Sequence, residues 1–285
     1  MEHEFQRVGI VGVGLIGGSL GLALKRTSYR THIRGFGRHQ DRLEAALRMG
    51  AIDDYSTFTG VAFDDCDLVV LATPVEHILE TLEHLDGVLA PGSVVTDVGS
   101  TKRAICEKAW VNLPAAAEFI GGHPIAGREV TGVENSRADL FIDAPYVVCP
   151  RPGSDSPSLG KMLRLLDKIG ARAFVMTPQE HDLAVAWASH LPQLISTALA
   201  NAVQRCDAGI AGSGLRDMLR LAGSRYSVWE SILATNRDMI DEALAGFVCE
   251  LEAVRERLAA GSLAEEFDTA VRIYERFRSR QGSRN

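Results

Sequence analysis

The fold of this chain is decided near its beginning, where it reads Val8-Gly9-Ile10-Val11-Gly12-Val13-Gly14-Leu15-Ile16-Gly17. The first four residues form a continuous apolar run, which is typical of a strand buried in a parallel sheet. The glycines follow in the spacing GxGxxG, and residues 19–26 have helical periodicity with a basic end. Such a strand–turn–helix unit predicts a dinucleotide site, with the pyrophosphate at the helix N-terminus. The predicted cofactor contacts here are Gly12, Gly14, Leu15, Ile16 and Gly17.

The end of the second predicted strand, residues 31–36, bears on which dinucleotide binds. An NAD-binding domain usually carries an acid about 20 residues after the glycine turn, for the ribose 2′-hydroxyl. This chain has Gly37 and Arg38 there. A guanidinium can pair with a 2′-phosphate, so the sequence favours NADP over NAD. The alternative is that Arg38 is a solvated loop charge and Asp41 takes the ribose.

The first 176 residues alternate between strand and helix patterns. Further strands are expected at residues 67–72, 93–98, 118–120, 146–149 and 172–176, with helices at 75–85, 102–110 and 158–169. This alternation predicts an α/β fold with a doubly wound, Rossmann-type, mostly parallel sheet. Thr73-Pro74, Ser100 and His123 each follow a predicted strand. Because ligands bind at the carboxyl ends of such strands, we expect these residues to gather near Gly12.

The character of the sequence changes at Thr177-Pro178. Residues 177–285 show no strand pattern, and helices are expected at 178–206, 215–221, 227–232, 237–260 and 262–278, with a frayed end at 279–285. We therefore expect two domains, residues 1–176 and an all-α domain over 177–285. Many of these helices carry apolar residues on more than one side, which favours a homodimer built through the helical domain.

Composition excludes several classes of protein. The 285 residues include 46% hydrophobic and 24% charged residues, which is ordinary for a soluble globular protein. The net charge is −7 and no basic stripe is interleaved with aromatic residues, so no nucleic-acid partner is expected. No apolar run is long enough for a membrane span, and the start resembles no signal peptide. The five cysteines are widely spaced and outside any CxxC pattern, which indicates a cytoplasmic protein without disulfide or metal.

One histidine stands out in the run Gly121-Gly122-His123-Pro124-Ile125-Ala126-Gly127. The apolar residues 118–120 predict a strand, which the glycines and the proline are expected to end. An imidazole on the following loop could face a ligand, and its ordinary pKa near 6.5 suits proton transfer. Taken alone, the segment would better fit a histidine hydrogen-bonded into a turn.

Several motifs together identify a family. They are GVGLIGGSLGLALK from Gly12, ATPV from Ala72, DVGSTK from Asp97, GGHPIAG with Glu129, EHD from Glu180, SHLP from Ser189, RDMLRLA from Arg216, and Trp229. In this order the chain resembles the prephenate/arogenate (cyclohexadienyl) dehydrogenase family of tyrosine biosynthesis over essentially its whole length. The resemblance implies a NAD(P)-dependent oxidative decarboxylation in which the substrate ring loses hydride from C4 and CO2 from C1 and becomes aromatic. Neither a regulatory ACT domain nor a chorismate mutase segment is expected.

The resemblance also implies roles for particular residues. His123 matches the histidine that takes the proton of the C4 hydroxyl, and Ser100 matches a serine near the nicotinamide and that hydroxyl. Arg220 matches the arginine that binds substrate carboxylate; the alternative is a surface salt bridge, which the apolar neighbours Leu219 and Leu221 disfavour by predicting a largely buried helix. His181 and Asp182 are expected to be capping and interdomain residues.

The remaining substrate contacts are Ser189, His190, Gln193 and Trp229. His190 and Trp229 could instead belong to the core. Gln193 departs from the family pattern SHLPH, which leaves the role of that position open. The segment Ala186-Trp187-Ala188-Ser189-His190 contains no carboxylate to pair with the ammonium of arogenate. We therefore expect activity on prephenate at least as high as on arogenate.

Two other classes of protein compete with this interpretation. A β-hydroxyacid dehydrogenase would use a lysine in the helical domain, but no lysine follows Lys168. A non-catalytic, dinucleotide-sensing regulator would have no reason to keep Ser100, His123, His190 and Arg220 together.

Overall fold

The computed structural model describes residues 5–27, 31–57, 63–127, 130–153, 156–204 and 210–282. It divides into two compact units, residues 1–237 and 238–285, which are treated separately below. The boundary expected after residue 176 falls inside the first unit and stays a prediction.

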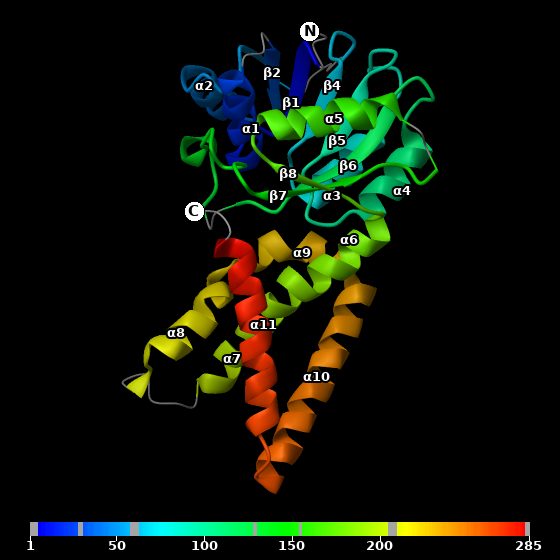
Figure 1. The fold of residues 1–285 in the computed structure, drawn as a ribbon. Helices are drawn as coiled ribbons and strands as arrows, with labels where there is room; N and C mark the ends of the chain where they lie inside the picture. Colours follow the sequence, from blue (N-terminus) through cyan, green and yellow to red (C-terminus); the bar gives the residue numbers. More distant parts are fainter. Residues whose placement is uncertain are drawn as a thin grey trace. The chain divides into compact units, whose positions relative to one another are not determined.

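The first unit is built on one sheet of eight strands in the order β3-β2-β1-β4-β5-β6-β7-β8 (Figure 1). All neighbouring strands are parallel except β6 and β7. The strands are β1 (Arg7–Val11), β2 (His32–Gly37), β3 (Asp54–Thr57), β4 (Leu68–Leu71), β5 (Val94–Asp97), β6 (Glu118–Pro124), β7 (Pro145–Cys149) and β8 (Arg172–Val175). The predicted doubly wound, mostly parallel sheet is confirmed, although the sequence patterns did not predict β3.

Helices of the first unit connect and cover these strands. They are α1 (Leu15–Arg26), α2 (Gln40–Arg48), α3 (Val75–Leu82), α4 (Arg103–Asn112), α5 (Pro157–Lys168), α6 (Pro178–Val185), α7 (Leu191–Val203), α8 (Ser213–Leu219) and α9 (Tyr226–Thr235). Short 3-10 segments lie at Val133–Asn135 and Arg220–Gly223.

Side chains alternate between the two faces of the sheet along each strand, and both faces are buried. In β4, Leu68 and Val70 join the core that contains α1, α2 and α5, whereas Val69 and Leu71 join the core that contains α3 and α4. Strands that are apolar on both faces require helices on both faces, which is why the sheet is the middle of three layers.

The strand order reverses at β1, because β2 follows on one side and β4 on the other. In open α/β sheets the carboxyl ends of strands at such a reversal form a crevice that receives a ligand. Gly12 follows β1 and Thr73 follows β4, so the fold brings these two predicted turns to the expected edge.

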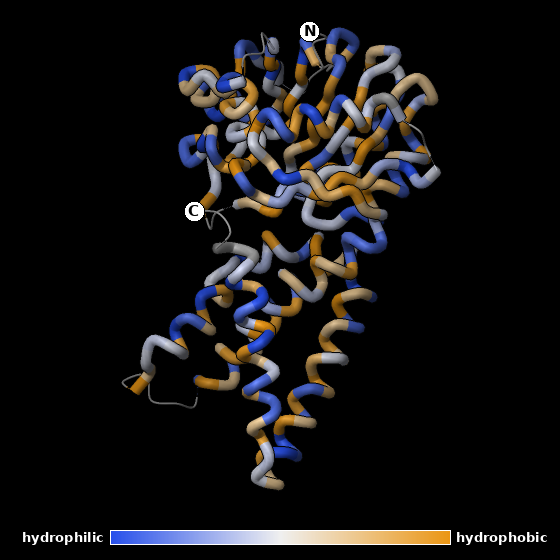
Figure 2. Tube along the Cα trace, in the orientation of Figure 1, coloured by the Kyte–Doolittle hydropathy of each residue, from blue (hydrophilic) through white to orange (hydrophobic). Residues whose placement is uncertain are grey.

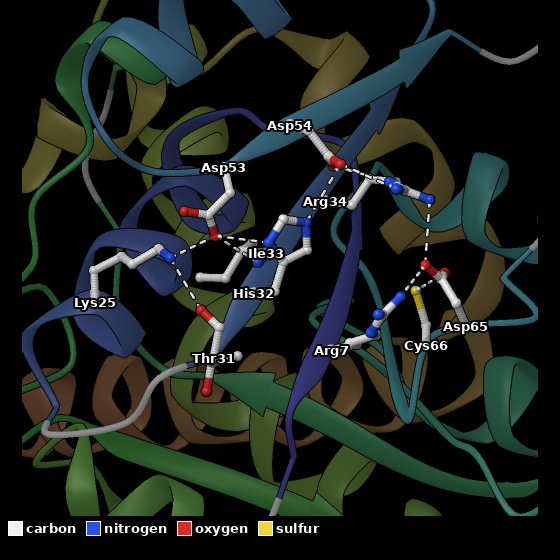
Figure 3. Close-up of polar contacts among 10 residues, drawn as sticks. All are labelled: Arg7, Lys25, Thr31, His32, Ile33, Arg34, Asp53, Asp54, Asp65 and Cys66. Atoms are coloured by element: carbon white, nitrogen blue, oxygen red, sulfur yellow. Dashed lines mark hydrogen bonds and ion pairs between the residues drawn. The ribbon is translucent and has the colours of Figure 1, made fainter.

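The amino-terminal ends of the strands, opposite to the ligand edge, carry a network of ion pairs. Arg34 Nε lies 2.8 Å from Asp54 Oδ1, and Arg7 Nη1 lies 2.8 Å from Asp65 Oδ2 (Figure 3). The pair with Asp54 raises the pKa of Arg34 above its ordinary value. This network lies at the amino-terminal ends of β1, β2 and β4, so we assign it to stability rather than to ligand binding.

The helix predicted over residues 178–206 has three parts. Thr177 and Glu180 form a capping box, and Pro178 occupies the first turn of α6. Residues Ala186–His190 form a π-helical segment between α6 and α7. Because π-bulges widen a helix at one turn and recur at functional sites, this segment is a candidate for ligand contact.

The second unit contains α10 (Arg237–Ala260), which begins at the boundary, and α11 (Ala264–Gly282). Both helices mix hydrophobic and hydrophilic residues along their length (Figure 2). Residues 279–285 were predicted to be frayed, but residues 279–282 continue α11, so the expectation is wrong for them. Residues 283–285 lie outside the described residues. No helix among the described residues is long and apolar enough to span a membrane.

Candidate active site

The glycine turn between β1 and α1 leaves room for a phosphate. Gly12 has φ +91°, and a Cβ there would lie 2.7 Å from the Ala72 carbonyl oxygen. A Cβ on Gly17 would lie 2.3 Å from the Gly12 oxygen, so Gly17 lets the helix approach the turn. No atom of the described residues lies within 4 Å of the Cβ position of Gly14, which caps α1 without a side-chain hydrogen bond. Open space beside an uncapped helix N-terminus fits a pyrophosphate.

The turn after β4 adds an unsatisfied polar atom to this edge. Thr73 Oγ1 is buried without a hydrogen-bond partner among the described residues. Pro74, exposed beside it, is the N-cap of α3. Ser100 is half-buried in the turn after β5. A buried hydroxyl without a partner costs free energy, so Thr73 indicates a polar ligand at this edge.

Gly37 ends β2, and Arg38 follows it and is exposed. Arg38 Nη2 lies 3.4 Å from His77 Nε2 on α3. Asp41 is exposed in the first turn of α2. After the carboxyl end of β2, the guanidinium of Arg38 therefore comes before the carboxylate of Asp41 in the chain, and both side chains are exposed.

His123 lies on a strand and not on a loop. Strand β6 continues through Gly121, Gly122 and His123 to Pro124, because this half of the strand pairs antiparallel with β7. The expectation that the glycines and the proline end the strand is therefore wrong. Antiparallel pairing with β7 fixes the backbone of His123 more firmly than a loop would.

Two further residues on α6 hold the His123 ring. His123 Nδ1 lies 2.8 Å from His181 Nε2, and His181 Nδ1 lies 2.7 Å from Asp182 Oδ1. Both oxygens of Asp182 also accept backbone N–H groups, from Lys102 at 2.7 Å and from Arg103 at 3.0 Å. Asp182 thus caps α4 and anchors His181, and His181 and Asp182 have no exposed surface.

The hydrogen bonds determine which ring nitrogens carry protons. The Asp182 carboxylate accepts, so His181 donates from Nδ1 and, when neutral, accepts at Nε2. His123 must then donate from Nδ1 to His181, which leaves the lone pair on His123 Nε2. Burial lowers the pKa of His123 well below its ordinary value, and His181, Lys102 and His190 add to the effect. Burial likewise lowers the pKa of His181, although Asp182 opposes the shift.

His190 is held in the same way by a residue that the sequence did not single out. The side-chain amide of Asn236 donates to the Asp182 carbonyl oxygen at 2.8 Å, which fixes its orientation. The same nitrogen lies 3.3 Å from His190 Nδ1, so that nitrogen accepts and the proton lies on Nε2. Burial lowers the pKa of His190 to about 4. His190 is therefore a neutral donor at neutral pH.

The other predicted substrate residues differ in how they are placed. Trp229 packs edge-to-face on His190, with ring centroids 5.9 Å apart, and its Nε1 is buried without a hydrogen-bond partner among the described residues. Gln193 is buried, and its amide nitrogen donates to the Leu221 carbonyl oxygen at 2.9 Å. Ser189 is exposed on the π-helical segment. The structure therefore brings His190 and Trp229 together, and it joins Gln193 to the turn after α8.

Arg220 begins that turn and is exposed. Helix α8 contains no buried residue, so the expectation of a largely buried helix around Arg220 is wrong. The apolar side chains of Leu219 and Leu221, on either side of Arg220 in the chain, are half-buried within this unit. Glu129 and Cys206 lie outside the described residues, and the described cysteines are free. No group of histidine, cysteine or acidic side chains able to hold a metal occurs in the described part of the chain.

Sequence reasoning missed His181, Asp182 and Asn236 as parts of the site. The motif Glu180-His181-Asp182 was visible, but its position near a helix start indicated capping. The capping role is correct for Asp182, which caps α4 from 79 positions away, as the bond to Arg103 shows. Nothing in the sequence connects Asn236 to His190.

Comparison with known proteins gives a consistent result. Residues 20–175 match the family model described as prephenate dehydrogenase, nucleotide-binding domain, and residues 177–272 match prephenate dehydrogenase, dimerization domain. The prephenate dehydrogenase of Bacillus subtilis is 32% identical over 271 residues, which cover 92% of this chain and 73% of that protein.

Two solved structures are similar along almost the whole chain. The prephenate dehydrogenase of A. aeolicus, in complex with hydroxyphenyl propionate and NAD+, has a TM-score of 0.87 and 28% identity, with 96% of this chain and 98% of that chain covered. The arogenate dehydrogenase of Synechocystis has a TM-score of 0.82 and 31% identity, with 96% and 99% covered.

Proposed function

This chain belongs to the prephenate dehydrogenase family, and from the geometry of its site we propose that His123 accepts the proton of the reaction. The chain is an NAD(P)-dependent oxidoreductase that oxidatively decarboxylates prephenate or arogenate. The observation that carries the proposal is the 2.8 Å contact between His123 Nδ1 and His181 Nε2. It leaves His123 Nε2 as the basic nitrogen of the pair.

The chemistry requires such a nitrogen. When bound, the nicotinamide accepts the hydride from C4 of the substrate ring. The C4 hydroxyl gives up its proton as the hydride leaves, and a neutral imidazole within hydrogen-bond reach can take it. Loss of CO2 then makes the ring aromatic, and the C4 oxygen takes up a proton again to give the phenol. His123 supplies that imidazole because burial and neighbouring histidines keep it unprotonated at neutral pH. Asp182, through His181, holds the ring in the accepting tautomer.

We assign the cofactor to the edge formed by the turns after β1, β4 and β5. Its contacts are Gly12, Gly14, Leu15, Ile16, Gly17, Gly37, Arg38, Thr73, Pro74 and Ser100. Ser100 also lies in the turn that leads from β5 toward α4, where it can orient the nicotinamide and the substrate hydroxyl. Arg38 and the absence of an acid at the end of β2 support NADP as the preferred dinucleotide.

We assign the substrate to Arg220, His190, Ser189, Trp229 and Gln193. Arg220 supplies the positive charge for a carboxylate, and His190 supplies a neutral donor. Because His190 is neutral, it adds no positive charge that would hold the departing carboxylate and oppose the loss of CO2. None of these residues is acidic, so the ammonium of arogenate lacks a partner, and prephenate activity should be at least as high as arogenate activity.

We further propose that the enzyme is a cytoplasmic homodimer that pairs through residues 177–285. Helices α10 and α11 expose many large apolar side chains, among them Leu251, Leu258, Phe267, Tyr274 and Phe277. An apolar surface of this kind favours a partner. The match of residues 177–272 to a dimerization domain supports the same assignment. Free cysteines at the described positions are consistent with a reducing compartment.

One experiment tests the substrate and cofactor assignments together. Initial rates are measured with prephenate and arogenate, each crossed with NAD and NADP. We expect the highest kcat/KM for prephenate with NADP. A kcat/KM for arogenate far above that for prephenate would reject the substrate assignment, and a strong preference for NAD would reject the role of Arg38.

A further inference from the structure

We propose that Asp97 and Lys102 form a positioning pair that binds the backbone of Gly122, beyond the end of the ladder between β5 and β6, and thereby fixes the ring of His123. The inference deepens the proposed function, since it rests on His123 as the proton acceptor. It concerns residues that neither the cofactor nor the substrate assignment uses.

The need for such a pair comes from the way β6 changes partner. The parallel ladder between β5 and β6 ends at the pair Thr96 and Ile120. From Gly121 onward β6 pairs only with β7, on its other side. The backbone groups of Gly122 that face β5 would therefore lack partners in the buried middle of the sheet, which costs free energy for each group.

Asp97 and Lys102 supply those partners. Asp97 Oδ1 accepts the Gly122 N–H at 3.0 Å, and Lys102 Nζ donates to the Gly122 carbonyl oxygen at 2.8 Å. Lys102 also donates to Asp97 Oδ2, which accepts the Gly99 N–H at 2.7 Å as well. Neither side chain of the pair has any exposed surface. Both polar groups of the residue before His123 are thus bound by charged side chains.

The two glycines before His123 make this arrangement possible. A Cβ on Gly122 would lie 2.5 Å from the Asp97 carbonyl oxygen and 2.9 Å from Thr96 Oγ1. A Cβ on Gly121 would lie 2.7 Å from Cys106 Sγ and 3.3 Å from Lys102 Cδ. Any larger residue would push β6 away from the pair, so the sequence Gly121-Gly122-His123 is required by packing as well as by chemistry.

The pair also acts on the histidines by its charge. The Lys102 ammonium disfavours protonation of both His123 and His181 and lowers the pKa of each. Asp97 partly opposes this at His181. The other groups facing the histidines are Asp182, which opposes the shift at His181, and His190, which adds to it at His123. Tyr146 on β7 is neutral, because burial raises its pKa.

A double variant separates positioning from folding. In Asp97→Asn/Lys102→Met both charges are removed together, so no uncompensated buried charge remains. We expect kcat to fall at least about tenfold with an unchanged Kd for the dinucleotide. We also expect the pKa of His123, followed by NMR of the imidazole ring, to rise, since the Lys102 cation is lost.

The control is Arg34→Met/Asp54→Asn, which removes the ion pair at the opposite edge of the sheet (Figure 3). It should leave kcat and the His123 titration as in the wild type. Wild-type kcat and an unchanged His123 pKa in the folded Asp97→Asn/Lys102→Met protein would overturn the proposal, as would a wild-type His123 pKa at or above 6.5. If the double variant retains activity while His123→Asn abolishes it, the proposed role of Asp97 and Lys102 is wrong, whereas His123 remains the proposed proton acceptor.

Discussion

His123 and His181 form a hydrogen bond of 2.8 Å between Nδ1 and Nε2, although 58 positions separate them in the chain. The strand β6 supplies one ring and helix α6 supplies the other. The contact gives His123 a defined tautomer, and the predictions that follow depend on it.

The first prediction concerns the proton acceptor itself. His123→Asn keeps a polar side chain of similar length but removes the basic Nε2. We expect kcat to fall by roughly 10²–10⁴, the usual range for loss of a general base. Binding of the dinucleotide, measured by titration calorimetry, should be largely preserved. A variant with near wild-type kcat would show that another group takes the proton.

The second prediction concerns His181 as a positioning residue. His181→Leu removes the acceptor for His123 Nδ1–H, and we expect kcat to fall about tenfold to a hundredfold, as for other partners that orient a histidine. His181→Gln should recover part of the loss, because its amide oxygen can accept the same hydrogen bond. KM should change little in either. Equal rates for the leucine and glutamine variants would argue against the hydrogen bond as the cause.

The third prediction links His190 to stability. The pKa of His190 is about 4 in the folded protein against 6.5 as the ordinary value. Its neutral form is therefore favoured by folding, and this contribution is complete above pH 6.5 and is lost as the pH falls toward 4. It amounts to about 3 kcal/mol at full strength.

Urea unfolding at pH 7.5, 5.5 and 4.5 measures this effect. The free energy of unfolding should fall with pH in the wild type, and less steeply in His190→Gln. Asp182 and His181 also face this ring and act on it in opposite directions, so the comparison is between slopes and not between absolute stabilities. Parallel curves for the two proteins would contradict the assignment of His190 as buried and neutral.

The fourth prediction concerns Arg38 and the dinucleotide. Arg38→Asp should lower kcat/KM for NADP about tenfold to a hundredfold, because a carboxylate replaces the guanidinium that would meet the 2′-phosphate. The value for NAD should change little. Arg42→Ala, which removes another exposed arginine one turn along, serves as the control and should leave both values unchanged. An equal loss of kcat/KM for both dinucleotides would show that Arg38 does not distinguish them through the 2′-phosphate.

The fifth prediction concerns Arg220 and the substrate. Arg220→Ala should raise KM for prephenate about tenfold to a hundredfold, the size expected for a hydrogen bond to a charged group. Affinity for the dinucleotide should stay constant. Arg216→Ala, four positions earlier on α8, is the matched control. If dinucleotide affinity falls and KM for prephenate does not rise, Arg220 belongs to the other site.

The sequence by itself predicted most of the sheet and the edge at which we propose that the ligand binds. Local patterns suffice there, because a buried parallel strand must be apolar on both faces and a tight turn around a phosphate needs glycine. For the same reason the run from Val8 to Gly17 predicted β1, the turn and α1 together. The motif around His123 likewise pointed to the histidine that we propose as proton acceptor, although its strand was expected to end too early.

Only the tertiary structure decided how that histidine is held. Strand β6 continues past two glycines because β7 and the pair Asp97 and Lys102 supply partners to its backbone, and none of these is adjacent in the sequence. Asp182 and Asn236 acquire their roles from contacts across 79 and 46 positions. Hydrogen bonds between distant segments leave no periodic signal in a sequence, so the tautomers and the pKa of the site emerge only when the chain is folded.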